Sequence, residues 1–134
     1  METGFSTDTF FRYSGQSLYE YFSAVIDNSE GVLPLEAQKL MQRLDDADEE
    51  HLVYGIEICS RFGLIKDFRR FVKYLTDCKL SVFCAMQRAL MNAELRSVEP
   101  ALPEIRTAMQ NLSQPNLQAI EETIRHLEQK SLLP

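Results

Sequence analysis

The chain of 134 residues lacks most of the patterns that mark specialised classes of protein. It has only five glycines and five prolines, so we expect no low-complexity linker. No apolar run approaches the roughly 18 residues that a membrane-spanning helix needs. The first residues, METGFSTDTFF, lack the basic start and apolar core of a secretory signal. We therefore expect a cytoplasmic protein with no part in the membrane.

The three cysteines and two histidines do not predict a metal site or a disulfide framework. An odd number of cysteines without a secretory signal argues against stabilising disulfides. Cys59 and Cys84 fall on apolar helix faces, where a free cysteine behaves as a small apolar residue. Cys78 lies six residues before Cys84, which is not the paired spacing of a zinc site. We expect His51 and His126 to be surface residues.

The local motifs of common enzymes are also missing. The sequence has no G-x-S-x-G elbow and no glycine-rich phosphate loop. The acidic run DDADEE (45–50) lacks the glycine and the spaced glutamate of a calcium loop. We predict no catalytic residue, no cofactor and no metal, and a protein that is not an enzyme.

Positive charge is scarce, and it is concentrated in one segment. The net charge is −6, but residues 1–60 carry twelve acids and three bases, whereas residues 61–80 carry six bases and two acids. Nucleic-acid binding depends largely on neutralising phosphates. The overall balance therefore makes nucleic acid an unlikely partner.

What the sequence does contain is helical periodicity, seen most clearly in DADEEHLVYGIEICSRFG (46–63). Asp48 can cap a helix, and the two glutamates that follow favour its positive N-terminal end. Gly63 can take the left-handed conformation that ends a helix. The pattern predicts a helix from about 49 to 62 that places these apolar and small residues on one face: Leu52, Gly55, Ile56, Cys59 and Phe62.

Six further segments repeat this spacing, and no stretch alternates as a strand would. Pro34 can start a helix, and Pro100 and Pro103 delay another to about Leu102. The predicted fold is all-α, with about seven helices in stacked antiparallel hairpins; an irregular helical bundle is the alternative. The helices are expected at about 16–27, 34–44, 49–62, 65–75, 80–94, 102–112 and 115–129.

The length fits a single domain, residues 1–134. Within it we expect an N-terminal aromatic segment or cap at 1–14, helical repeats at 15–129 and a tail at 130–134. A weak repeat supports this division, because Gly55, Ala85 and Ala119 each stand in mid-helix before a large apolar residue. With its helix–turn–helix rhythm, the chain resembles the HEAT and armadillo class of helical repeats, and the resemblance implies a stack of helical hairpins.

The segment RFGLIKDFRRFVK (61–73) contains the first candidate binding surface. On an α-helix, Lys66, Arg69 and Lys73 would form one exposed stripe with Arg70 beside it. This basic stripe could be a solvated face that pairs with neighbouring acids, a docking surface for an acidic partner, or a contact for a nucleic-acid backbone.

The aromatic N-terminus is the second candidate, since seven of the thirteen aromatic residues lie between positions 5 and 22. Phe10, Phe11 and Tyr13 have no clear set of helical partners. They could cap the open end of a stack, or they could anchor a partner, because aromatic residues are frequent in binding hot spots.

Together these features favour a non-enzymatic protein-interaction module of the adaptor, assembly-factor, chaperone or inhibitor type. Its partner would be another protein, with an acidic surface facing the basic stripe. The alternative is an acidic regulator that presents DDADEE as a mimic of nucleic acid. In a count of seven, the last predicted helix, 115–129, lacks a partner unless an extra short helix forms at residues 7–13. Its free side could therefore also join two copies of the chain.

Overall fold

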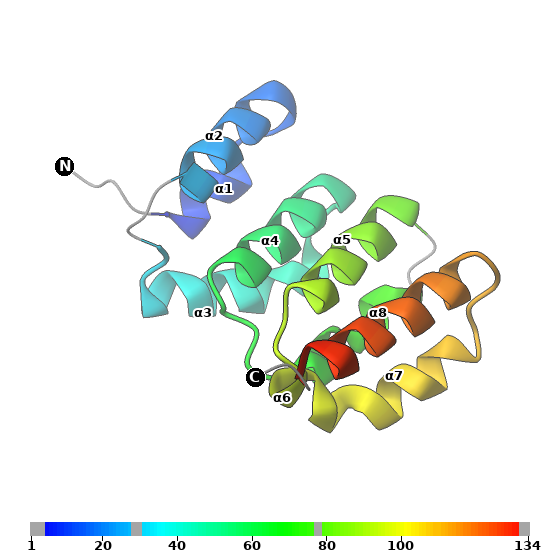
Figure 1. Cartoon of the computed structure of the whole chain (residues 1–134). Coiled ribbons are helices and arrows are strands. Elements are labelled where there is room, and N and C mark those ends of the chain that lie inside the picture. The colour runs from blue at the N-terminus through cyan, green and yellow to red at the C-terminus, as the bar shows by residue number, and fades with distance from the viewer. Residues whose placement is uncertain (1–4, 28–30, 77–78, 132–134) are drawn as a thin grey trace. The chain divides into compact units, whose positions relative to one another are not determined.

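The computed structural model describes residues 5–27, 31–76 and 79–131, and all its regular elements are helices. No strand occurs in these residues, so the prediction of an all-α fold is confirmed. The chain divides into two compact units, residues 1–64 and 65–134. Figure 1 shows the helices of each unit, coloured by residue number from the N-terminus to the C-terminus.

Over the residues of unit 1 that the structure describes, the chain forms four α-helices and one short 3-10 helix. α1 packs against α2 and α3, and α2 packs against α4. The last turn of α3 continues directly into η1, which also contacts α4. The elements are α1 (Thr7–Arg12), α2 (Gly15–Asp27), α3 (Pro34–Arg43), η1 (Leu44–Asp46) and α4 (Glu49–Arg61).

The short helix α1 is fastened to its neighbours at its first turn. The Ser6 side chain caps it by accepting the Thr9 amide. Thr7 is fully buried, its amide donates to Glu36 Oε1 at 2.7 Å, and its hydroxyl donates to the Glu36 carbonyl at 2.9 Å. These bonds, led by the Thr7 amide, lower the pKa of the Glu36 carboxyl. The N-terminal segment is therefore part of the packed unit.

Both ends of α4 follow the predicted chemistry. The Asp48 side chain accepts the His51 amide at 2.9 Å, so Asp48 is the N-cap. Gly63 has φ +64°, and its amide bonds to the Ser60 carbonyl while the Leu64 amide bonds to the Cys59 carbonyl. This pair of bonds is the Schellman ending of a helix. The caps are local, which explains why the sequence predicted them.

Gly55 lies at a close approach inside unit 1. A Cβ atom at this position would collide with Leu44 Cδ2 and would also meet Leu40 Cδ1 at 3.7 Å. The small residue therefore lets α4 approach the segment that precedes it. The core around it holds these buried apolar residues: Phe5, Phe10, Leu18, Val25, Leu40, Leu44, Leu52, Ile56, Ile58 and Cys59.

Unit 2 is built around α5, which packs against α8 and against the long 3-10 helix η2. α7 packs on η2, and the short α6 contacts both α8 and η2. The apolar row of α8 (Ile120, Ile124 and Leu127) is buried, so the expectation that the last helix has no partner is wrong within this unit. The elements are η2 (Phe68–Thr76), α5 (Leu80–Met91), α6 (Leu95–Val98), η3 (Glu99–Ala101), α7 (Leu102–Met109) and α8 (Asn116–Ser131).

Several helix boundaries differ from the predicted ones. The segment predicted as an α-helix at 65–75 is the 3-10 helix η2, which begins at Phe68. Residues 95–101, predicted as a connection, form α6 and η3 because Val98 and Ala101 are fully buried. α7 begins at Leu102, as predicted from Pro103, and α8 extends to Ser131, into the predicted tail. The remaining tail residues, 132–134, lie outside the described residues.

The stacked-hairpin arrangement stays a prediction, as does the HEAT-like repeat. Gly55 and Ala85 stand in mid-helix, in α4 and α5, whereas Ala119 lies in the first turn of α8. Ala85 is buried and Ala119 is half-buried. Among the described residues, no helix is both long enough and apolar enough to cross a bilayer.

Candidate functional site

The four basic residues singled out from the sequence are all exposed. Lys66 lies just before η2, and Arg69, Arg70 and Lys73 lie within it. The rest of η2 faces the core of unit 2, where five of its side chains are buried: Phe68, Phe71, Val72, Tyr74 and Leu75. We call Lys66, Arg69, Arg70 and Lys73 the basic surface. The structure therefore places these charges on a backbone that packing holds in place.

The 3-10 geometry changes how the basic surface is ordered. With three residues per turn, side chains at i and i+3 line up, so Arg70 and Lys73 share one row. Arg69 falls in a different row, in which the next residue is the buried Val72. The stripe of Lys66, Arg69 and Lys73, predicted on an α-helix, is thus wrong in its register. Lys73 also lies over the ring of Tyr74, with Nζ 5.4 Å from the ring centre.

Arg69 is paired within the chain. Its guanidinium donates to both carboxylate oxygens of Asp67, at 2.6 Å to Oδ2 and 3.0 Å to Oδ1, and its amide donates to Oδ1. The hydrogen bond from the guanidinium lowers the pKa of Asp67 and raises the pKa of Arg69. Because the pair is exposed, it contributes little to stability. The pair does hold the Arg69 guanidinium, one of the four cations of the basic surface, in one position.

The aromatic candidates Phe10, Phe11 and Tyr13 have three different environments. Phe10 is fully buried, so its ring cannot reach another molecule in this structure. Phe11 is half-buried, and Tyr13 is 39% exposed. The structure brings these three together in unit 1. The basic surface lies in unit 2.

His51 holds the junction between α1 and α2, contrary to the expectation of a surface residue. It is only 5% exposed. Its Nδ1 lies 2.8 Å from Asp48 Oδ1, and its Nε2 lies 2.8 Å from the Tyr13 carbonyl oxygen. Both partners are oxygen atoms, and which ring nitrogen donates depends on the tautomer. The neighbouring Glu50 accepts the Gly15 amide at 2.9 Å, where Gly15 has φ +57°.

The acidic run found in the sequence thus has a structural role at two positions. Asp48 caps α4 and orients His51, and the His51 amide is the main cause that lowers the pKa of the Asp48 carboxyl. Glu50 fastens the α1–α2 junction. We call this set of contacts, from Asp48, Glu50 and His51 to Tyr13 and Gly15, the junction clamp.

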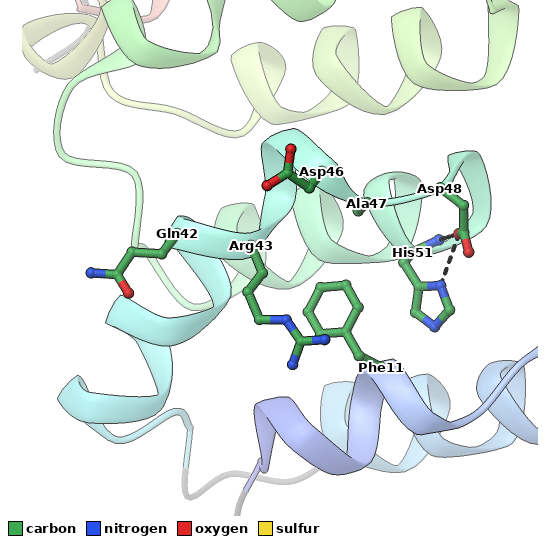
Figure 2. A pocket seen from close by; sticks show the side chains of 7 residues that line it. All are labelled: Phe11, Gln42, Arg43, Asp46, Ala47, Asp48 and His51. Carbon is green, nitrogen blue, oxygen red and sulfur yellow. Dashed lines mark hydrogen bonds and ion pairs between the residues drawn. The ribbon is translucent and has the colours of Figure 1, made fainter.

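A pocket of about 260 Å³ lies beside the junction clamp (Figure 2). Figure 2 shows the Phe11 ring between Arg43 and His51. The Arg43 guanidinium lies 4.0 Å from the ring centre, and the His51 ring stacks on Phe11 at 5.1 Å. The pocket is lined by Phe11, Gln42, Arg43, Asp46, Ala47, Asp48 and His51.

Arg43 and His51, which line this pocket, are already bonded to other groups of the chain. Arg43 pairs with Asp8 at 3.6 Å, and both nitrogens of His51 are occupied. A general base must present a nitrogen to the substrate, but here Nε2 faces the Tyr13 carbonyl. The His51–Asp48 pair therefore acts on the chain itself, by holding α1 and α2 against α4.

No metal-binding group of three or more histidine, cysteine or acidic residues occurs in the part of the chain that the structure describes. Cys59 is buried, with its thiol 3.5 Å from the Met41 sulfur, and Cys84 is half-buried. Cys78 lies outside the described residues. His126 is exposed on α8, as expected.

Comparisons with known proteins give no relative of this chain: no family model, no curated protein and no solved structure matches it.

Proposed function

We propose that this chain is a non-enzymatic protein-interaction module that binds an acidic surface of a partner protein through its basic surface. The observation that carries the proposal is the environment of η2. Four basic side chains are exposed on a segment whose opposite side is buried at five positions. In a chain of net charge −6, this is a local reversal of sign.

The rigid placement of these charges favours binding over simple solvation. Ordering flexible side chains and loops costs free energy when a complex forms. Packing of η2 against α5 and α7 has already fixed the backbone, and the Asp67 pair has fixed Arg69. Arg70 and Lys73 share a row, so they can meet neighbouring carboxylates on a partner.

Charge reversal tests the proposal. The double variant Arg70→Glu, Lys73→Glu should lose partner proteins that the wild-type chain captures, and their capture should weaken as salt is raised. The control variant Arg96→Glu, Arg125→Glu changes the net charge by the same amount at two other exposed positions of unit 2. It should capture the same proteins as the wild type.

The measurement is quantitative mass spectrometry of proteins retained by each immobilised chain, with a melting curve for each variant. Equal capture by the two double variants would contradict a specific role for η2. A large drop in the melting temperature of the η2 variant would show that Arg70 and Lys73 are structural instead. The charge-mimic alternative for residues 45–50 stays a prediction.

A further inference from the structure

A second open pocket, of about 330 Å³, lies at the α1–α2 junction of unit 1. Tyr13 lines it from just before α2. Ser17, Glu20 and Tyr21 line it from α2, where a spacing of three and four residues places them on one face of the helix. The rings of Tyr13 and Tyr21 have their centres 5.6 Å apart and their planes at 57°.

Hydrogen bonds to other segments hold the backbone of Tyr13 and the hydroxyl of Tyr21 in position. The Tyr13 carbonyl accepts His51 Nε2, which fixes the backbone that carries this ring. The Tyr21 hydroxyl accepts the Ser6 amide at 2.8 Å and donates to the Ser6 carbonyl at 3.3 Å. The pocket is thus formed before any ligand arrives, which reduces the cost of binding.

The residues that line the pocket favour a positively charged ligand. The faces of aromatic rings carry negative potential and attract ammonium and guanidinium groups. Glu20 adds a carboxylate that is exposed and has no hydrogen bond or ion pair with any residue the structure describes. The surrounding sequence, residues 1–60, has nine more acids than bases, so the field there also favours positive charge.

We propose that this pocket binds the side chain of a lysine or arginine in a basic segment of a partner protein. The charged end of that side chain pairs with Glu20, and its stem lies against Tyr13 and Tyr21. Three of the four lining residues are exposed, so the pocket is open to a side chain carried by a larger molecule. The site is independent of the proposed function, because it lies in the other unit and takes the opposite charge.

The probe is a blocked Gly-Lys-Gly peptide, titrated into the isotopically labelled chain and followed by NMR chemical shifts. Its control is the same peptide with norleucine, which has a similar stem and no charge. We expect the lysine peptide to shift the amides of residues 13–21, weakly but saturably, and the norleucine peptide to leave them unchanged. Equal shifts with both peptides would overturn the proposal, since the pocket would then bind only an apolar stem.

Matched variants locate the binding. Tyr13→Leu and Glu20→Gln should each weaken the lysine peptide about two- to fivefold, the usual effect of one exposed cation–π or ion-pair contact. Tyr13→Phe should keep wild-type affinity because it keeps the ring. Tyr19→Leu and Asp27→Asn alter exposed residues of α2 that do not line the pocket, and they should bind as the wild type does. Equal weakening by Asp27→Asn and Glu20→Gln would overturn the proposal by showing a general charge effect.

Discussion

Replacing His51 with alanine should destabilise unit 1 more than any surface substitution would. The imidazole makes two hydrogen bonds of 2.8 Å, to Asp48 and to the Tyr13 carbonyl, and stacks on Phe11. His51→Ala removes all three contacts at once. It also leaves the Tyr13 carbonyl without its partner in the junction clamp.

The size of the effect follows from these contacts. Losing the partner of a buried hydrogen-bonding group costs about 1–3 kcal/mol. Losing an aromatic pair costs a further 0.5–1.5 kcal/mol, roughly. We expect the free energy of unfolding to fall by about 2–4 kcal/mol, a large share of the 5–15 kcal/mol that is typical of a domain.

Urea denaturation followed by circular dichroism measures this loss, and the chain offers its own control. His126 is exposed on α8, so His126→Ala should change the free energy of unfolding by less than about 0.5 kcal/mol. Equal, small effects of the two substitutions would refute the clamp, because they would show that His51 makes no bonds that matter for folding.

Three further substitutions test the neighbouring contacts. Thr7→Val should lower the free energy of unfolding by about 0.5–1.5 kcal/mol, measured in urea, because it removes the hydrogen bond from the buried Thr7 hydroxyl to the Glu36 carbonyl. Gly63→Ala should lower the melting temperature, since alanine at φ +64° costs about 1–2 kcal/mol; an unchanged melting temperature would argue against the Schellman ending. Asp48→Asn keeps a capping oxygen but loses the charge. The folded pKa of Asp48 lies below its ordinary value of 3.8, so its charge stabilises the fold above pH 3.8 and this stabilisation is lost as the pH falls through the folded pKa. The stability gap between the wild type and Asp48→Asn should therefore be widest near neutral pH and close in acid; a gap that does not depend on pH would contradict the reasoning.

The parts of the fold that depend on nearby residues could be predicted from the sequence. The caps of α4 involve Asp48 and Gly63 with residues at most five positions away, and both ends were predicted. Pro34 and Pro103 likewise mark the first turns of α3 and α7. Local chemistry of this kind does not need the rest of the chain.

The form of η2 could not be predicted in the same way. Its buried residues Phe68, Phe71, Val72 and Leu75 fit a spacing of three and four, which suits both an α-helix and a 3-10 helix. Packing against α5 and α7 accompanies the tighter form, and that information is distant in sequence. The exposure of the basic residues was predicted correctly. Which of them line up in one row along the helix was not.

His51 and Phe10 show the same limit at the candidate site. The partner of His51 Nε2 lies 38 residues earlier in the chain, so no local pattern marks this histidine as buried. Phe10 and Phe11 are adjacent and chemically identical, yet only Phe10 is fully buried. The capping position of Asp48, three residues before His51, was the only local signal for the clamp, since it places the two side chains on the same side of the first turn.

The position of Tyr13 links the fold to its proposed binding sites. His51 and Glu50 hold the α1–α2 junction, and that junction places the Tyr13 ring beside Glu20. Unit 1 then offers an acidic aromatic pocket, while unit 2 offers the basic surface of η2. In both proposals the surface takes a partner group of opposite charge, and each surface can be altered by variants at residues that the other does not use.

Chemical modification of the two histidines tests most directly whether the first turn of α4 holds the α1–α2 junction. Diethyl pyrocarbonate reacts with accessible imidazole nitrogens, and mass spectrometry reads the extent of reaction at each histidine. In the native chain we predict fast modification of the exposed His126 and little modification of His51, whose two nitrogens are both hydrogen-bonded. In urea both should react. Equal rates at His51 and His126 in the native chain would contradict the clamp.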